Sequence, residues 1–332
     1  MLNDKTILVT GGTGSFGHRF VSYTLAHYKP RKIIIYSRDE FKQFNMNNAY
    51  REYEDILRFF VGDVRDEARL KRALHDVDFV IHAAALKQVP SCEYNPIEAV
   101  KTNINGAVNV IDACLDAGVK KVVALSTDKA VSPINLYGST KMVSDKLFTA
   151  SNAYSGPEGT RFSVVRYGNV AGSRGSVIPF FQSLIDDGGT ELPLTDFRMT
   201  RFWISLTQGV QLVIKALGEA RGGETFVSKI PSFKVTDLAQ AMLPGCQMKE
   251  VGIREGEKLH EVMVSAEDSL RTYEYEAHYI IYPHYDWWSS EKIIPGGKPV
   301  EPGFIYSSDN NKQWLSVKDI QHLLCADLES EK

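Results

Sequence analysis

Short runs of β-branched and aromatic residues alternate with helical patterns through the first half of the chain, and this alternation constrains the fold most. The runs are TILVT, KIIIYS, LRFFVGDV, DFVIHAA, KVVALST and RFSVVRYGNV. Between them lie amphipathic segments such as residues 97–117, in which apolar residues recur at helical spacing. Strands that alternate with helices predict a doubly wound parallel sheet of the α/β class, with helices on both faces.

The alternation weakens after Gly172, where Pro, Gly and aromatic residues become more frequent, as in IIYPHYDWWSS and IIPGGKPVEPGF. We therefore expect residues 1–171 to form the first domain. Residues 172–332 are expected to form a smaller, loop-rich α/β substrate lobe that closes over the carboxyl edge of the sheet. The helical pattern over 206–219 and the run ETFVSK predict that a segment near 204–230 returns to the first domain.

Composition excludes several classes of protein. With 332 residues, of which 43% are hydrophobic, the chain can bury a sizeable core. A net charge of −3 without a Lys/Arg block gives no reason to expect nucleic acid or an anionic membrane as a partner. The four cysteines are widely separated and show neither a disulfide framework nor metal-ligand spacing. We expect a soluble cytoplasmic protein without a metal, a signal peptide or a membrane span.

A glycine-rich turn, TGGTGSFG, ends the first predicted strand and opens a helix. Glycines at this point allow the backbone to approach a pyrophosphate, whose charge the helix N-terminus stabilises. Similar turns occur in ordinary loops, but the position after an N-terminal strand favours a Rossmann-type dinucleotide site. The turn is expected to contribute Gly11, Thr13, Gly14, Ser15, Phe16 and Gly17.

The end of the second predicted strand bears on the choice between two dinucleotides. It carries Ser37 and Arg38, with Lys42 one turn later. A hydroxyl and two cations suit the 2′-phosphate of NADP, which we expect as the cofactor. In the alternative, Arg38 and Lys42 form a solvated face with Asp39 and Glu40, and Asp39 keeps NAD possible.

Two further strand ends complete the expected cofactor site. By analogy with this architecture, Asp63 and Val64 would contact the adenine, although Asp63 could equally cap a helix. The small residues after the fourth strand, Ala83, Ala84 and Ala85, would form the floor under the dinucleotide.

Several motifs together carry a family resemblance. TGGTGSFG, HAAA and a Tyr-x-x-x-Lys pattern after a strand that ends in Ser-Thr resemble the extended short-chain dehydrogenase/reductase superfamily. Within it, SRDEFKQ, ALKQVP, STDKAVSPINLYGSTK, RYGNVAGSRGSVIP and REGEKLHE closely resemble the inverting UDP-N-acetylglucosamine 4,6-dehydratases of the pseudaminic acid pathway. The resemblance covers nearly the whole chain.

The Tyr-x-x-x-Lys pair, Tyr137 and Lys141, suits the removal of a proton from a sugar hydroxyl. The ammonium one helical turn away, together with the positive nicotinamide ring, is expected to lower the pKa of the phenol. Tyr137 would then act as base while hydride leaves the same carbon, and Thr127 would donate to the same hydroxyl. Both Tyr137 and Lys141 are also expected to touch the cofactor.

Asp128 and Lys129 follow the same strand end. The resemblance implies that Asp128 is the acid at C6 and Lys129 the base at C5, and a lysine in a closed pocket can be neutral enough to accept a proton. Retaining dehydratases that act on dTDP-glucose typically carry Asp-Glu here, so Asp-Lys fits the inverting branch. The alternative is a turn with a solvated ion pair.

The implied reaction oxidises C4, eliminates water across C5 and C6, and returns the hydride to C6. It is a carbon–oxygen lyase reaction that restores NADP in each cycle. The expected product is UDP-2-acetamido-2,6-dideoxy-β-L-arabino-hex-4-ulose, the first step toward pseudaminic acid and flagellin glycosylation. Family positions around the UDP-sugar match Lys87, Thr127, Asn169, the segment 172–177 with Val177, Thr195, Arg201, Arg254 and Glu257.

Other functions stay open at this point. A UDP-sugar 4-epimerase would share Tyr137 and Lys141 but would not use Asp128 and Lys129. A dehydratase for another deoxyamino sugar of capsule or O-antigen would keep the chemistry, and a redox-sensing NADP-binding module would lack turnover. The family also implies a homo-oligomer, either a dimer or a hexamer.

Overall fold

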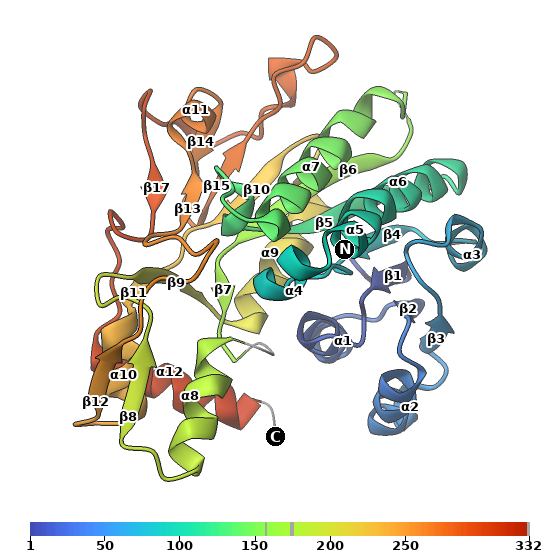
Figure 1. The fold of residues 1–332 in the computed structure, drawn as a ribbon. Helices are drawn as coiled ribbons and strands as arrows, with labels where there is room; N and C mark the ends of the chain where they lie inside the picture. Colours follow the sequence, from blue (N-terminus) through green and yellow to red (C-terminus); the bar gives the residue numbers. More distant parts are fainter. Residues whose placement is uncertain (157, 173–175, 331–332) are drawn as a thin grey trace.

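The computed structural model describes residues 1–156, 158–172 and 176–330, and its centre is a ten-stranded sheet (Figure 1). The strand order is β16-β14-β15-β10-β6-β5-β4-β1-β2-β3, and the strands from β10 to β3 run parallel. This sheet confirms the predicted fold class. The parallel strands are β1 (Thr6–Thr10), β2 (Lys32–Ser37), β3 (Leu57–Val61), β4 (Phe79–His82), β5 (Lys121–Thr127), β6 (Arg161–Tyr167) and β10 (Thr225–Ser228).

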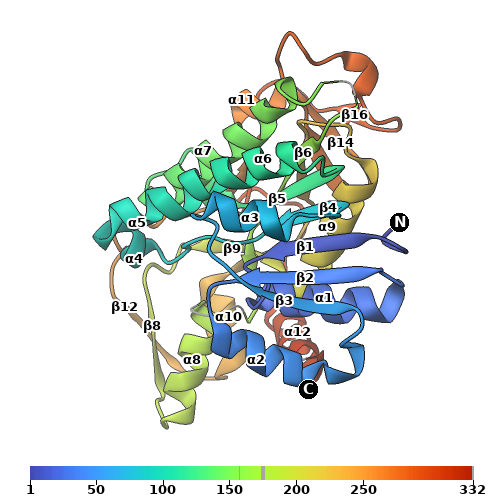
Figure 2. The ribbon, with the colours of Figure 1, turned by 90° about the vertical axis from the view of Figure 1, so that its right-hand side faces the viewer.

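Helices cover both faces of the parallel strands, which explains why these strands read as continuous apolar runs. Along β1, Ile7 and Val9 join one apolar cluster and Leu8 joins the other, because successive side chains point to opposite faces. Figure 2 shows the two layers of helices on either side of the sheet. One face carries α1 (Ser15–His27), α2 (Glu40–Ala49) and α9 (Leu206–Glu219), and the other carries α3 (Glu67–Ala73), α6 (Gly106–Asp116) and α7 (Leu136–Ala150).

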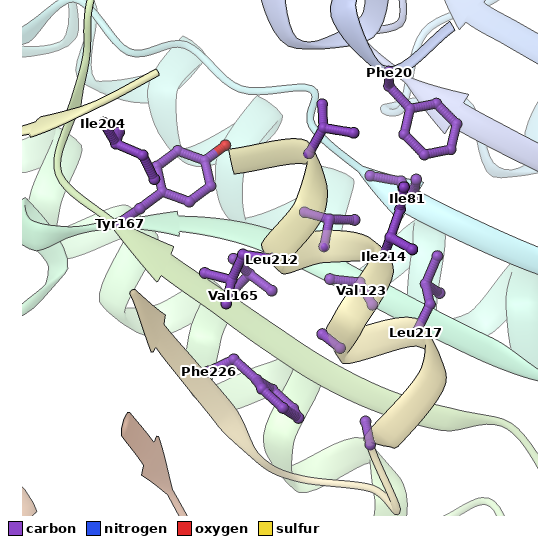
Figure 3. Close-up of a cluster of buried hydrophobic side chains, with 14 of the residues drawn as sticks. Phe20, Ile81, Val123, Val165, Tyr167, Ile204, Leu212, Ile214, Leu217 and Phe226 are labelled. Atoms are coloured by element: carbon purple, nitrogen blue, oxygen red, sulfur yellow. The ribbon is translucent and has the colours of Figure 1, made fainter. Parts of the chain in front are cut away.

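Helix α9 comes from the second half of the sequence but packs on the first part of the sheet. It contacts α1, β5 and β6, and Ser205 begins it with a capping box to Gln208. Its apolar side chains, including Leu212 and Leu217, lie against the strands near Val123 (Figure 3). The chain therefore crosses back over the sheet before it reaches β10, which pairs with β6.

Three short antiparallel strands extend the large sheet beyond β10. They are β14 (Thr272–Glu274), β15 (His278–Ile281) and β16 (Lys298–Pro299), all from the range assigned to the second lobe. Pro and Gly interrupt this region of the sequence, so the period-2 pattern is too short to signal sheet membership. The division of the chain between residues 171 and 172 stays a prediction.

The range assigned to the second lobe contains an apolar core of its own, in which Phe181, Trp203, Leu238 and Ile320 are buried. Strands of this range form small sheets in the orders β11-β9-β7 and β12-β8, and β7 joins them from the range assigned to the first domain. The strands are β7 (Asn169–Val170), β8 (Glu191–Leu194), β9 (Thr200–Ile204), β11 (Ser232–Lys234) and β12 (Gln247–Glu250); the helices are α8 (Val177–Asp186), α10 (Val235–Met242) and α12 (Val317–Ser330). A separate pair, β13 (Val262–Val264) with β17 (Tyr306–Ser307), lies beside α11 (Ala266–Ser269).

The amphipathic segment 97–117 is not one regular α-helix. It runs through α5 (Pro96–Val100), a π-helical turn (Lys101–Asn105) and α6. The wider turn coincides with Asn103, whose side chain accepts from the Leu86 backbone N–H at 2.8 Å and donates to the Leu86 carbonyl and to Thr140 Oγ1. Asn103 thereby fixes the loop that follows β4. Within the described part of the chain, every helix is too short or too polar to cross a bilayer.

Replacing Leu217, which is 1% exposed in α9, tests the packing of this helix on the sheet. We expect Leu217→Ala to lower the free energy of unfolding by about 2–5 kcal/mol, because it leaves a cavity in the core. Leu270→Ala removes the same atoms from a side chain that is 74% exposed and should change stability by less than about 0.5 kcal/mol. Chemical denaturation of both variants measures the difference, and equal stabilities would contradict the packing.

Candidate active site

A cavity of about 530 Å³ lies at the carboxyl ends of β1, β2, β4, β5 and β6. This is where parallel α/β sheets bind ligands, because the loops that leave adjacent strands diverge there. The cavity brings together nearly all residues predicted to hold the cofactor. They are Gly11, Thr13, Gly14, Ser15, Phe16, Ser37, Arg38, Lys42, Asp63, Val64, Ala83, Ala84, Ala85, Tyr137 and Lys141.

The glycine-rich turn packs closely on the loop that follows β4 and opens helix α1 at the cavity. Gly11 has φ +65°, and a Cβ there would lie 2.9 Å from the backbone N and Cα of Ala84. Helix α1 begins after Gly14 without a side-chain cap, so its first N–H groups are available to an anionic group. Gly17 does not line the cavity. A Cβ at Gly17 would lie 2.0 Å from the Gly12 carbonyl oxygen, so this glycine permits close packing of the helix on the turn.

The predicted NADP-selecting residues lie together at the end of β2, and both cations have carboxylate partners. Arg38 NH1 lies 3.6 Å from Asp63 Oδ2, and Lys42 Nζ lies 2.6 Å from Asp39 Oδ2. Ser37 Oγ accepts hydrogen bonds from Thr13 and from Gln43.

Gln43 was missed in the sequence. It is 4% exposed and also donates to the carbonyls of Ser37 and Phe60, so it ties the ends of β2 and β3 together. Gln43 ends the quoted motif SRDEFKQ, which was the available signal.

The segment between β5 and α7 places the predicted catalytic residues. β5 ends at Thr127, and a single 3₁₀ turn (Asp128–Ala130) follows. Asn135 then caps α7 by accepting from the Gly138 N–H at 2.7 Å. Tyr137 therefore stands in the first turn of α7, with Lys141 one turn later, and both face the cavity.

The electrostatics around Tyr137 differ from the sequence expectation. Burial raises the pKa of Tyr137 to about 12, and the charge of Lys129 is the main influence that opposes it. Burial lowers the pKa of Lys141, which Asp145 partly offsets. The protein groups alone therefore do not lower the Tyr137 pKa as expected, because desolvation of the phenolate outweighs the ammonium of Lys129.

Asp128 and Lys129 form an ion pair in which Asp128 is fully buried, whereas Lys129 is 24% exposed and lines the cavity. Asp128 is 0% exposed, accepts from Thr127 Oγ1 at 3.0 Å and lies 3.1 Å from Lys129 Nζ. Burial raises the pKa of Asp128, which favours the protonated form that an acid needs. Lys129 Nζ also donates to Asn169 Oδ1 at 3.3 Å.

Lys129 is not made neutral by its surroundings. Burial works to lower its pKa, but the charges of Asp128 and Glu261 outweigh burial and raise the pKa above its ordinary value. The expectation of a neutral lysine is therefore wrong for this arrangement, because two carboxylates flank the amine. Lys129 rests as an ammonium.

Glu261 is the main site residue that sequence reasoning missed. It is 2% exposed, and its Oε1 lies 3.2 Å from Lys129 Nζ and 3.9 Å from Arg201 Nε. Asn135 Nδ2 donates to the Gly256 carbonyl, and Lys258 Nζ donates to the Val131 carbonyl. The segment 256–261 is thus fastened to the catalytic segment at several points. Glu261 ends the quoted motif REGEKLHE, which was the available signal.

The residues predicted around the UDP-sugar divide into two groups. Lys87, Thr127 and Asn169 line the cavity. Val177, Thr195, Arg201, Arg254 and Glu257 do not, and residues 173–175 of the predicted segment 172–177 lie outside the described residues.

Two of the outer group show why they stay out of the cavity. Arg201 donates to the carbonyls of Thr200 and Leu259, so its guanidinium is held by backbone, and Arg254 is exposed. The two arginines predicted to lie around the UDP-sugar therefore have different surroundings in the structure.

Comparisons with known proteins agree with this geometry. A profile described as "Polysaccharide biosynthesis protein" matches residues 7–283. A UDP-N-acetylglucosamine 4,6-dehydratase (inverting) of Campylobacter jejuni is 56% identical over 98% of both chains. A UDP-glucose 4-epimerase of Rickettsia typhi is 42% identical over 98% of this chain and 96% of its own. These matches confirm the resemblance found in the sequence.

Solved structures share the fold. Pen from Bacillus thuringiensis is 37% identical, with a TM-score of 0.88 over 98% of this chain and 99% of its own. A dTDP-glucose 4,6-dehydratase from Streptomyces venezuelae, solved with NAD bound, is 25% identical, with a TM-score of 0.68 over 76% of this chain and 86% of its own. The large sheet thus matches the Rossmann-type sheet of dinucleotide-binding dehydratases.

Gly11→Ala tests the cradle for the dinucleotide. We expect it to weaken dinucleotide binding and to lower stability by more than the roughly 1–2 kcal/mol cost of a left-handed alanine, because its Cβ also meets Ala84. Gly118→Ala is the matched control, since Gly118 shares φ +65° but a Cβ there meets nothing within 4 Å. Thermal unfolding and dinucleotide titration measure both effects. Equal behaviour of the two variants would argue against the close approach.

Proposed function

This chain belongs to the polysaccharide biosynthesis protein family of the profile match, and on that premise we propose that it is a C5-inverting UDP-N-acetylglucosamine 4,6-dehydratase. One observation carries the proposal. Lys129 and Tyr137 line the cavity that also contains the dinucleotide turn, and the fully buried Asp128, which does not line it, lies 3.1 Å from Lys129 Nζ. An enzyme that only oxidised and reduced a sugar carbon would have no use for this second pair.

Oxidation at C4 is the first step of the proposed reaction. The uncapped start of α1 fits a dinucleotide pyrophosphate, and Gly11 and Gly14 of the preceding turn line the same cavity. The dinucleotide would accept hydride from C4 and later supply it to C6. Tyr137 holds the proton of the C4 hydroxyl, and Thr127, which hydrogen bonds to Tyr137, orients that hydroxyl. Because the protein groups leave the Tyr137 pKa high, the positive nicotinamide is needed to lower it.

Elimination of water is the second step. The C4 ketone makes the C5 proton acidic, and the C6 hydroxyl becomes a leaving group in the β position. Asp128, whose pKa burial raises, would give its proton to the departing hydroxyl. Lys129 stands next to it and takes the C5 proton. The expected product is UDP-2-acetamido-2,6-dideoxy-β-L-arabino-hex-4-ulose, which would serve pseudaminic acid synthesis.

A UDP-sugar 4-epimerase is the second candidate, because a relative of that name covers almost the whole chain at 42% identity. An epimerase needs Tyr137 and the cofactor but no acid at C6 and no base at C5. Withdrawing an ion pair from water lowers the stability of the fold, because both charges lose solvation. An epimerase would bear this cost without a catalytic role for the pair. We therefore favour the dehydratase.

For the sugar nucleotide, we propose that Lys87, Thr127 and Asn169 contact the hexose side of the substrate. The roles of Val177, Thr195, Arg201, Arg254 and Glu257 around the UDP rest on the resemblance. Self-association as a dimer or a hexamer and membership of the flagellin glycosylation pathway are further expectations of the same kind.

NADP is the proposed cofactor, and Arg38 tests it. Asp63, the partner of Arg38, also accepts three hydrogen bonds from Arg65, so Arg38 can turn to a 2′-phosphate without leaving that carboxylate unpaired. We expect Arg38→Ala to raise the Kd for NADP about 10- to 100-fold and to leave NAD binding nearly unchanged, because only NADP loses a charged hydrogen bond. Exposed Arg51→Ala is the control. Titration of both variants with NADP and NAD measures the change in Kd. Equally weakened binding of the two dinucleotides would contradict selection of NADP by Arg38 and would favour NAD as the cofactor.

The dehydratase is tested by incubation with UDP-N-acetylglucosamine in deuterated water, followed by proton NMR. We expect a C6 methyl signal, deuterium at C5 and an L-arabino ring pattern. Lys129→Ala should lower methyl formation by about 10²-fold or more, because the base at C5 is lost. Exposed Lys312→Ala should not alter the rate. Formation of UDP-N-acetylgalactosamine without a C6 methyl signal would show that the protein acts as an epimerase and not as a dehydratase.

A further inference from the structure

Glu261 is held rigidly against the catalytic lysine by residues far away in sequence. Its backbone N–H donates to Ser308 Oγ at 2.9 Å, and its carbonyl accepts from the Ser308 N–H at 2.8 Å. The residue directly precedes β13, which pairs with β17. With the backbone fixed on both sides, the side chain has little freedom, and its Oε1 stays 3.2 Å from Lys129 Nζ.

Across the residues that the structure describes, the second carboxylate oxygen of Glu261, Oε2, makes no contact that explains its burial. Oε2 is buried and, among the described residues, has no hydrogen-bond partner. A buried carboxylate oxygen without a partner is costly, so such atoms call for a functional explanation. Burial works against the charge of Glu261, but Lys129 and Arg201 outweigh it and lower the pKa of this carboxyl. Glu261 therefore rests as a carboxylate that can still receive a proton.

Lys129 must lose a proton before it can act at C5. The charged and titratable groups around it are Asp128, Glu261, Arg201, Lys258 and Tyr137. Asp128 cannot accept that proton, because it has to carry its own proton to the C6 hydroxyl. Arg201 and Lys258 are cations, and Tyr137 is occupied with the C4 hydroxyl.

Resting on the proposed function, we propose that Glu261 is the positioning residue of the C5 step: it accepts a proton from Lys129 and so frees the amine to take the proton from C5. An N–H bond of Lys129 breaks and an O–H bond of Glu261 forms across the 3.2 Å contact. The nitrogen lone pair then takes the C5 proton, and the electrons of the C5–H bond form the C5–C6 double bond as the C6 hydroxyl leaves.

The protons balance over one cycle. After elimination, the Lys129–Glu261 pair holds one proton more than at rest, and Asp128 holds one fewer. The contact of 3.1 Å between Lys129 Nζ and Asp128 Oδ1 allows that proton to return to Asp128. The proton of the C4 hydroxyl, held at Tyr137, balances the one that C5 later regains.

Glu261→Gln tests the proposal because it keeps the size and an acceptor oxygen but cannot take a proton. With substrate and dinucleotide bound at about pH 7, we expect deuterium incorporation at C5 to fall about 10²-fold. The rate of C4 oxidation, measured by the transient absorbance of the reduced dinucleotide, should change less than about threefold. The Kd for UDP should also change less than about threefold, because neither C4 oxidation nor UDP binding uses the carboxylate. Glu255→Gln, an exposed carboxylate of the same segment, is the matched control and should behave as wild type.

The pH profile separates proton transfer from a structural role. In the wild type, the C5 step should be independent of pH near neutrality, because Lys129 gives its proton to Glu261 and not to solvent. In Glu261→Gln, solvent must deprotonate Lys129, so the C5 step should rise about tenfold per pH unit between about pH 7 and pH 9. Glu261→Asp retains a proton acceptor and should be slower but equally independent of pH.

Several outcomes would overturn the inference. One is a Glu261→Gln variant with the wild-type rate and profile; another is equal loss of C4 oxidation, UDP binding and the C5 step, which indicates a structural role. If Glu261→Gln does not fold, a pH-dependent C5 step in Glu261→Asp overturns it. A wild type that forms no methyl group overturns the proposed function itself, whereas an active wild type with an unaltered variant overturns only the role of Glu261.

Discussion

The buried group of Asp128, Lys129, Glu261 and Arg201 is the interaction on which the site depends. Buried charges are tolerated only when they are paired with good geometry, since desolvation otherwise outweighs attraction. Asp128 and Lys129 leave the end of β5, whereas Glu261 and Arg201 come from the second half of the chain. Each half therefore supplies charges that the other half must neutralise, and this requirement fixes the relative position of the catalytic segment and the segment 256–261.

The parallel sheet decides where that group can form. Helices bury both faces of β1, β4, β5 and β6, so most residues within these strands are apolar and most of their polar side chains lie near the strand ends. The dinucleotide turn leaves β1 at the same edge at which Thr127 ends β5. A group that handles hydride and groups that handle protons are thus brought to one cavity by strand order alone.

Sequence reasoning found the features that are local. The apolar runs predicted all parallel strands of the first half, the glycine spacing predicted the turn, and the spacing of Tyr137 and Lys141 required only one helical turn. What it missed depends on residues distant in sequence. The roles of Gln43 and Glu261 depend on partners that no sequence pattern reveals. The π-helical turn at Asn103 coincides with a hydrogen bond to Leu86. The protonation of Lys129 was mispredicted for the same reason, because it depends on Glu261.

The proposed dependence of Lys129 on a second carboxylate follows from its proposed role as the base at C5. Retaining dehydratases that resemble this family carry a glutamate at this position, and a glutamate base is already deprotonated at neutral pH. A lysine is protonated at neutral pH and adds a buried positive charge, so it needs both a counter-charge and a proton acceptor. Asp128 can supply neither while it holds the proton for C6. Under the proposal, Glu261 supplies both, because its charge balances the ammonium and its Oε1 lies 3.2 Å from Lys129 Nζ, within reach of the proton.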